Sequence, residues 1–119
     1  MQLSKMKNKY FNKIKKLLKQ TYPRLAAKYR LEFKNCFGAI AGYADDHIFI
    51  SCGKFGVALR LPPETLDNVF KEKGVKRLKY FPDGHVKKEY AILPKRIMKS
   101  KQRFKGLIDK SIKYTLSSH

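Results

Sequence analysis

Four side chains in this chain are of types that act as nucleophiles, bases or zinc ligands: Cys36, His47, Cys52 and His85. Protein zinc sites usually draw their ligands from close pairs such as Cys-x-x-Cys, and these four residues show no such spacing. A catalytic thiol also needs a base within hydrogen-bond reach and a group that orients the base. Both cysteines instead fall in apolar runs typical of buried strands, where thiols are usually inert. The sequence therefore predicts no metal, no cofactor and no disulfide framework.

The acidic residues favour a structural interpretation as well. Asp45 and Asp46 separate two apolar runs, which is typical of a turn and not of a paired acid and base. The sequence has neither a Walker phosphate loop nor a GxGxxG fingerprint, so nucleotide hydrolysis and dinucleotide binding have no support. We therefore expect a protein that is not an enzyme.

Charge is the strongest functional signal. The chain has 28 Lys and Arg against 9 Asp and Glu, for a net charge of +19. Residues 1–35 hold 11 basic residues and one acidic residue, residues 36–70 hold 2 and 4, and residues 71–119 hold 15 and 4. A basic balance favours anionic partners: nucleic acid, an anionic membrane surface or an acidic protein. The alternative is a lysine-rich surface that serves solubility.

Nucleic-acid binding would use basic residues of the second half of the chain, because lysine and arginine neutralise phosphates and release counterions. The candidate residues are Lys76, Arg77, Lys79, Lys87, Lys88, Lys95, Arg96, Lys99 and Arg103. Tyr80, Phe81 and Tyr90 are interleaved with them and either stack on unpaired bases or pack within the fold. No helix-turn-helix, RNA-recognition or zinc-finger signature is present, so we expect little sequence preference for DNA or RNA.

The elements that would position these residues begin with a central apolar stretch, residues 37–61. Three short runs rich in Ile, Phe, Val and Tyr predict strands over 36–44, 47–52 and 55–61. Asp45-Asp46 and Gly53-Lys54 would form the turns between them. Gly38 and Gly42, inside the first run, indicate a bulge or a close approach of two backbones.

A second hairpin is predicted over 75–81 and 85–93. Phe81-Pro82-Asp83-Gly84 between the two strands fits a type I turn with Gly84 in the left-handed conformation. That turn would place Arg77 opposite Glu89, whereas a two-residue turn would oppose two lysines.

Helical periodicity appears at both ends of the chain. Residues 3–20 carry one apolar stripe, formed by Leu3, Met6, Tyr10, Phe11, Ile14, Leu17 and Leu18. That stripe either covers the sheet, which we favour, or lies on a membrane surface. Further helices are predicted within 24–34, after Pro63, over 95–98 and from Ser100 to about Leu116. The sequence thus predicts one α+β domain, residues 1–119, whose antiparallel β-sheet (a three-stranded meander plus a second hairpin) is flanked by N-terminal and C-terminal amphipathic helices.

Location is indicated by what the N-terminus and the apolar runs do not contain. Residues 1–20 lack the unbroken apolar core of a secretory signal, and no run approaches the roughly 18 apolar residues of a membrane span. With no disulfide pattern, a cytoplasmic protein is expected.

Several motifs, in this order, resemble the TfoX N-terminal domain family, the module of a bacterial regulator of natural competence. Phe37-Gly38, Asp45-Asp46 and the following apolar run resemble the family's opening pattern, and 57–62 resembles its third strand. Tyr80–Gly84, Lys88–Tyr90 and Leu93-Pro94 resemble its second hairpin. The resemblance covers residues 25–117, with the basic helix of residues 1–22 preceding it. It differs at Ala39 and Asp46, where the family has glycine.

The resemblance implies an α+β fold and a role in regulation, in a stand-alone form without the C-terminal domain of the larger regulators. Our leading hypothesis is a bacterial, cytoplasmic accessory or regulatory module that binds nucleic acid through a basic surface. The alternative is a protein-protein interaction module whose lysines serve only solubility or steering. Membrane-surface binding through the first helix is a weaker third hypothesis.

Overall fold

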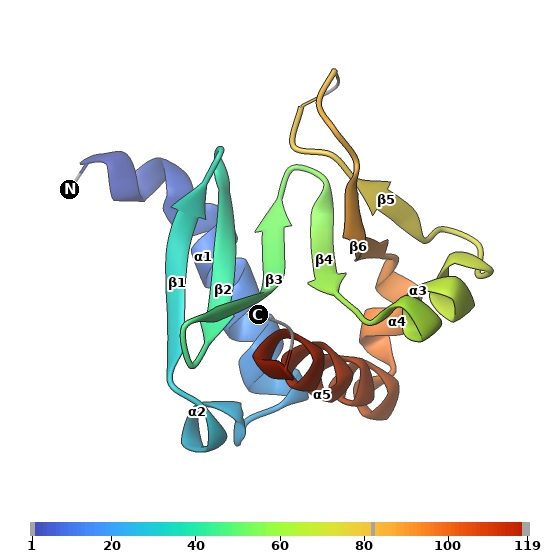
Figure 1. Ribbon diagram of the computed structural model, residues 1–119. Coiled ribbons are helices and arrows are strands. Elements are labelled where there is room, and N and C mark those ends of the chain that lie inside the picture. Colours follow the sequence, from blue (N-terminus) through green and yellow to red (C-terminus); the bar gives the residue numbers. More distant parts are fainter. Residues whose placement is uncertain (1, 82, 118–119) are drawn as a thin grey trace.

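The computed structural model describes residues 2–81 and 83–117, with side chains from residue 9 onward. The helices are α1 (Gln2–Thr21), α2 (Leu25–Lys28), α3 (Pro63–Phe70), α4 (Lys95–Lys99) and α5 (Lys101–Ser117). The strands are β1 (Leu31–Cys36), β2 (Ala39–Ala44), β3 (His47–Gly53), β4 (Gly56–Arg60), β5 (Lys76–Leu78) and β6 (Lys87–Leu93). Figure 1 shows this order along the chain.

The strands form one six-stranded sheet in the order β1-β2-β3-β4-β6-β5, and every neighbouring pair is antiparallel. The expected α+β fold, with an antiparallel sheet between N-terminal and C-terminal helices, is confirmed. The predicted meander is one strand longer than expected, because β1 precedes it. The second hairpin joins the sheet through β6, which pairs with β4.

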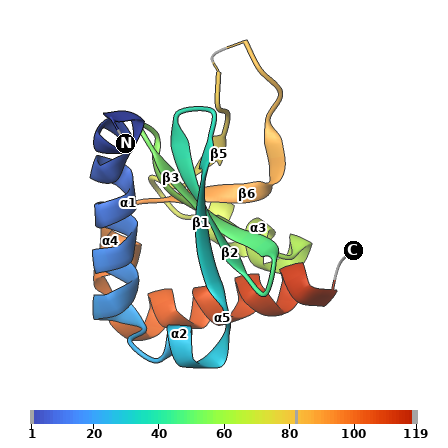
Figure 2. The ribbon, with the colours of Figure 1, turned by 90° about the vertical axis from the view of Figure 1, so that its left-hand side faces the viewer.

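Two helices cover one face of the sheet. α1 contacts β2 and β3, and α5 contacts β3 and β4 as well as α1. Figure 2 shows α1 standing beside the sheet and α5 passing beneath it. Ile14 and Leu18 of α1 are buried, and Tyr10, Phe11 and Leu17 pack partly against the core. The helix-on-sheet interpretation is thus confirmed for these residues, while Leu3 and Met6 lie outside the described side chains.

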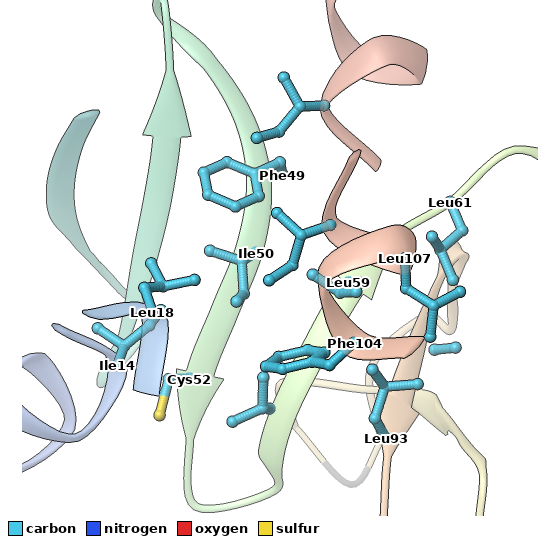
Figure 3. Packing of buried hydrophobic residues seen from close by; sticks show 14 of the residues in the cluster. Ile14, Leu18, Phe49, Ile50, Cys52, Leu59, Leu61, Leu93, Phe104 and Leu107 are labelled. Carbon is cyan, nitrogen blue, oxygen red and sulfur yellow. The ribbon is translucent and has the colours of Figure 1, made fainter. Parts of the chain in front are cut away.

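The hydrophobic core lies between the central strands and these helices. Alternate residues of a strand point to the same face, so Ile50 and Cys52 of β3 point to the helices together with Leu59 of β4. Phe104 of α5 meets them there and is fully buried (Figure 3). Burial of an aromatic side chain of this size stabilises the folded state by roughly 1.5–3 kcal/mol.

A β-bulge in β3 connects the sheet to α5. Gly42 pairs with Ile50, but Tyr43 pairs with Ile48, so Phe49 is an extra residue in the strand. Phe49 is fully buried, and its backbone oxygen accepts a hydrogen bond of 3.0 Å from the buried Ser111 hydroxyl of α5. A buried carbonyl left without a partner costs about 1–3 kcal/mol, so this bond stabilises the packing of α5 on the bulge.

The prediction for residues 24–44 is wrong in one respect. The short helix expected within 24–34 is present as α2, but the single strand expected over 36–44 is two strands, because β1 begins at Leu31 and β2 follows at Ala39. The break comes at Phe37 and Gly38, with φ of 49° and 83°, which form a two-residue turn between β1 and β2. Phenylalanine rarely adopts positive φ, so its residue type does not signal this turn.

The register predicted for the second hairpin is also wrong. Arg77 pairs with Ala91 instead of Glu89, and the register shifts after Arg77 so that Leu78 pairs with Lys87. The connection is a longer loop, in which Gly84 lies outside the left-handed region. Glu89 has other partners: its carboxylate accepts hydrogen bonds from Arg60 (2.9 Å) and from Tyr114 (2.5 Å).

Gly42 provides a test of the sheet packing. A Cβ at this position would lie 2.6 Å from Cγ2 of Ile50 and 3.2 Å from the ring of Phe33. We expect Gly42→Ala to lower the free energy of unfolding by about 1–3 kcal/mol, because over-packing strains a close-packed interior. Urea denaturation with a circular-dichroism readout measures the change.

The matched control is Gly106→Ala in α5, where an added Cβ has no heavy atom within 4 Å. Alanine in a helix interior is more favourable than glycine by roughly 0.5–1 kcal/mol, so this variant should be more stable than the wild type. A Gly42→Ala protein as stable as the wild type would contradict the close packing of β2 on Ile50.

Candidate nucleic-acid interface

The nine predicted phosphate-binding residues are all exposed, and the fold divides them into two groups. Lys76, Arg77, Lys79, Lys87 and Lys88 belong to β5, β6 and their connecting loop, while Lys95, Arg96, Lys99 and Arg103 belong to α4 and α5. The loop after α3 adjoins the second group, because Arg96 donates a hydrogen bond of 2.8 Å to the backbone oxygen of Lys73.

The arginines of the set make contacts within the protein. Nη1 of Arg103 lies 2.9 Å from Oε1 of Glu72, its Nη2 contacts the other carboxylate oxygen, and Arg96 lies 3.9 Å from the same carboxylate. The hydrogen bond from Arg103 lowers the pKa of Glu72 below its ordinary value, because it favours the ionised carboxylate. Arg77 stacks over the ring of Phe70, 4.4 Å from its centroid. The three arginines of the set thus have partners within the protein, which a ligand would have to compete with.

Two of these lysines border a groove that the sequence did not reveal. An open groove of about 450 Å³ lies between α1, α4 and the start of α5. We call it the lysine groove; its described lining contains five lysines and no acidic residue. The lysines are Lys13, Lys16, Lys95, Lys99 and Lys101.

Helical spacing explains why these side chains line a single groove. Lys13, Lys16 and Leu17 are three and four residues apart on α1, and Lys95, Met98 and Lys99 repeat that spacing on α4. Residues with this spacing lie on one side of a helix. Leu17 and Met98, with Val57 of β4, provide the apolar part of the lining. The apolar stripe predicted that α1 packs on the sheet, but no local pattern placed its lysines beside α4.

None of the predicted hairpin residues is among the described residues that line the lysine groove. Lys88 lines a separate cleft of about 280 Å³ that also contains Asp67 and Glu89, so acidic side chains offset its charge. The Nζ atom of Lys87 lies 5.9 Å from the ring centroid of Tyr80. Of the predicted residues, Lys95 and Lys99 of α4 line the same groove as lysines of α1.

The aromatic residues of the hairpin have different surroundings. Tyr90 is half-buried, and burial raises the pKa of its hydroxyl, as expected for a packed side chain. Tyr80 is half-buried too, and its hydroxyl lies 3.0 Å from Oγ of Ser51. Phe81 is exposed, with 53% of its surface accessible, and contacts Phe37, which is 68% accessible.

Four rings thus form one group, which we call the aromatic cluster: Phe37, Phe55, Tyr80 and Phe81. Ring centroids are 5.6 Å apart for Phe37 and Tyr80, 5.5 Å for Phe37 and Phe81, and 5.7 Å for Phe55 and Tyr80. The rings come from the β1–β2 turn, the β3–β4 turn and the β5–β6 loop, which lie at the same end of the sheet (Figure 1). Sequence reasoning identified two of these residues and missed Phe37 and Phe55.

The four residues weighed as a zinc or nucleophile site have separate positions. Cys52 is buried, and this burial raises the pKa of its thiol, which makes the thiolate less available. Cys36 ends β1, His47 begins β3, and His85 is exposed in the β5–β6 loop. Within the described chain, no three His, Cys, Asp or Glu residues are grouped so that they could hold a metal ion.

No helix among the described residues is long and apolar enough to cross a membrane. Searches for similar proteins among family models, curated proteins and solved structures found no match.

Glu72 provides a test of how the arginines contribute. Glu72→Gln removes the carboxylate that contacts Arg96 and Arg103. We expect about two- to five-fold tighter binding of a labelled oligonucleotide at low salt, since an exposed ion pair holds such side chains by at most about 1 kcal/mol. Fluorescence anisotropy measures the affinity.

Glu64→Gln is the matched control, because it changes the net charge equally at an exposed position in the first turn of α3. Equal gains in the two variants would assign the effect to net charge and not to the arginines that Glu72 binds.

Proposed function

We propose that this protein is a non-enzymatic accessory or regulatory module of the TfoX N-terminal type, which acts in the cytoplasm and binds nucleic acid with little sequence preference. The proposed contact surface is the lysine groove together with the neighbouring basic side chain of α4, Arg96. The single observation that carries the proposal is that lysines from α1, α4 and α5 line one groove without an acidic residue.

The physical argument is electrostatic. Five cations close together raise the local positive potential and favour a polymer with regularly spaced phosphates. The contacts are lysine ammonium groups, which act as point charges and do not read base edges as bidentate arginines do. The proposed binding therefore depends strongly on salt and only weakly on sequence.

The salt dependence of the affinity is the first test of this proposal. If all five lysines contact phosphates, a plot of log affinity against log salt for a single strand should have a slope of about −3.5. Anisotropy titrations between about 50 and 200 mM salt would then show a loss of affinity of about 100-fold.

Charge reversal locates the surface. Lys95→Glu with Lys99→Glu removes two groove lysines, and we expect a shallower slope, by about 1.4 units, and a large loss of affinity at low salt. The matched control is Lys110→Glu with Lys113→Glu, because both residues are exposed on α5 and do not line the groove. Both double variants lower the net charge by four. Equal losses in the two proteins would show that only the overall charge matters, and would contradict the groove assignment.

A second candidate function is a protein-protein interaction module whose lysines serve solubility. The observation that favours it is the exposure of Phe37 and Phe81, since exposed apolar side chains often mark docking sites. The salt titration separates the two functions, because an apolar docking face has no steep salt dependence.

A further inference from the structure

The aromatic cluster is attached to the sheet on its inner side and exposes rings to solvent on its outer side. Tyr80 joins the cluster to the sheet, since it contacts Phe37 and Phe55 and lies within hydrogen-bond distance of Ser51. Ser51 is fully buried in the middle of β3, so this contact attaches the β5–β6 loop to a central strand of the sheet. Burial raises the pKa of the Tyr80 hydroxyl to about 12, as expected for a ring packed against the sheet.

Phe37 occupies a backbone position that its residue type disfavours. Its φ of 49° belongs to the left-handed region, where glycine, asparagine and aspartate are the usual residues. The first central position of a two-residue turn would accept asparagine more readily, yet a phenylalanine occupies it with 68% of its surface exposed. The turn does not require a large ring here, and the contacts with Tyr80 and Phe81 leave most of the ring exposed. Strained residues of this kind are often found at functional sites.

Basic residues adjoin the cluster, one through a ring contact and two as neighbours in the sequence. Lys54 precedes Phe55 in the β3–β4 turn, Lys79 precedes Tyr80, and Nζ of Lys87 lies 5.9 Å from the Tyr80 ring centroid. All three lysines are exposed, and Asp83 is the acidic residue of the β5–β6 loop. Exposed rings among cations match a ligand that has both flat apolar surfaces and negative charge. An unpaired nucleic-acid strand has both, whereas an apolar peptide has only the first.

The cluster and the lysine groove lie next to the same turn. Phe55 of the cluster and Val57 of the groove lining are two residues apart at the start of β4. Ser51, beneath the cluster, points to the face of the sheet opposite Cys52, whose side chain is in the core beneath the helices. The two features therefore flank the end of the β3–β4 hairpin on opposite faces of the sheet.

We propose that the aromatic cluster is a stacking site for unpaired bases, at which bases of a single strand lie against Phe37 and Phe81. This inference rests on the proposed nucleic-acid function and adds a preference for single strands over duplexes. Every base has a flat face, so the stacking does not depend on sequence.

The test uses three labelled probes of equal length: an oligothymidine strand, an abasic strand with the same phosphates, and a duplex. The variant is Phe37→Asn, because asparagine accepts the left-handed conformation and should preserve the turn. The wild type should bind oligothymidine more tightly than the abasic strand. The variant should lose about five-fold or more on oligothymidine, as expected for one stacked base, with unchanged affinity for the abasic strand and a melting temperature no lower than that of the wild type.

Phe37→Trp gives an independent readout, because the chain contains no tryptophan. The new indole should retain the affinity of the wild type for oligothymidine, and its fluorescence should be quenched when a base stacks on it. The abasic strand should leave the emission unchanged. Phe81→Ser should weaken oligothymidine binding in the same direction as Phe37→Asn.

The outcomes distinguish this inference from the proposed function. Equal binding of all three probes, unaffected by Phe37→Asn and steep in salt, would overturn the stacking site and leave nucleic-acid binding in place. Equal losses on the oligothymidine and abasic strands would also overturn it, because the ring would then affect only phosphate contacts. No binding of any probe would overturn both proposals and favour protein docking at the cluster.

Discussion

The β-bulge at Phe49 is the constraint on which the arrangement of the molecule depends. The bulge places an additional aromatic side chain in the core. It also provides a buried carbonyl oxygen that accepts a hydrogen bond from the Ser111 hydroxyl. The hydrogen bond fixes α5 against β3 by a polar contact, which is more directional than hydrophobic packing. α5 in turn contacts both α1 and α4, so the position of the lysine groove follows from the position of this helix.

The fold separates two kinds of positive charge. The arginines Arg60, Arg96 and Arg103 contact the acidic residues Glu89 and Glu72. The lysines of α1 and α4 instead gather in a groove whose described lining contains no acidic residue. Guanidinium groups form planar, directional contacts with carboxylates, while ammonium groups remain strongly hydrated. These three arginines therefore pair with carboxylates of the chain, while the groove lysines contribute positive surface potential.

The elements were predictable where local chemistry decides them, and the site was not. Apolar stripes and prolines such as Pro62 and Pro94 indicate the helices and strand ends directly. β1 was missed because Phe37 occupies a turn position that its residue type disfavours. The hairpin register was wrong because Glu89 binds Arg60 and Tyr114, which belong to other elements. The lysine groove depends on how α1 meets α4, and no local pattern contains that information.

The lysine groove has a consequence for the energetics of folding. Its five like charges repel one another across the space between α1 and the α4–α5 segment, and this repulsion opposes the seating of α1 on the sheet. A polyanion in the groove removes that electrostatic work. Any ligand that binds only the assembled groove stabilises the folded chain, by about 2.7 kcal/mol at a hundred times its dissociation constant. Binding in the groove and packing of the first helix on the sheet are thus thermodynamically coupled, so each favours the other.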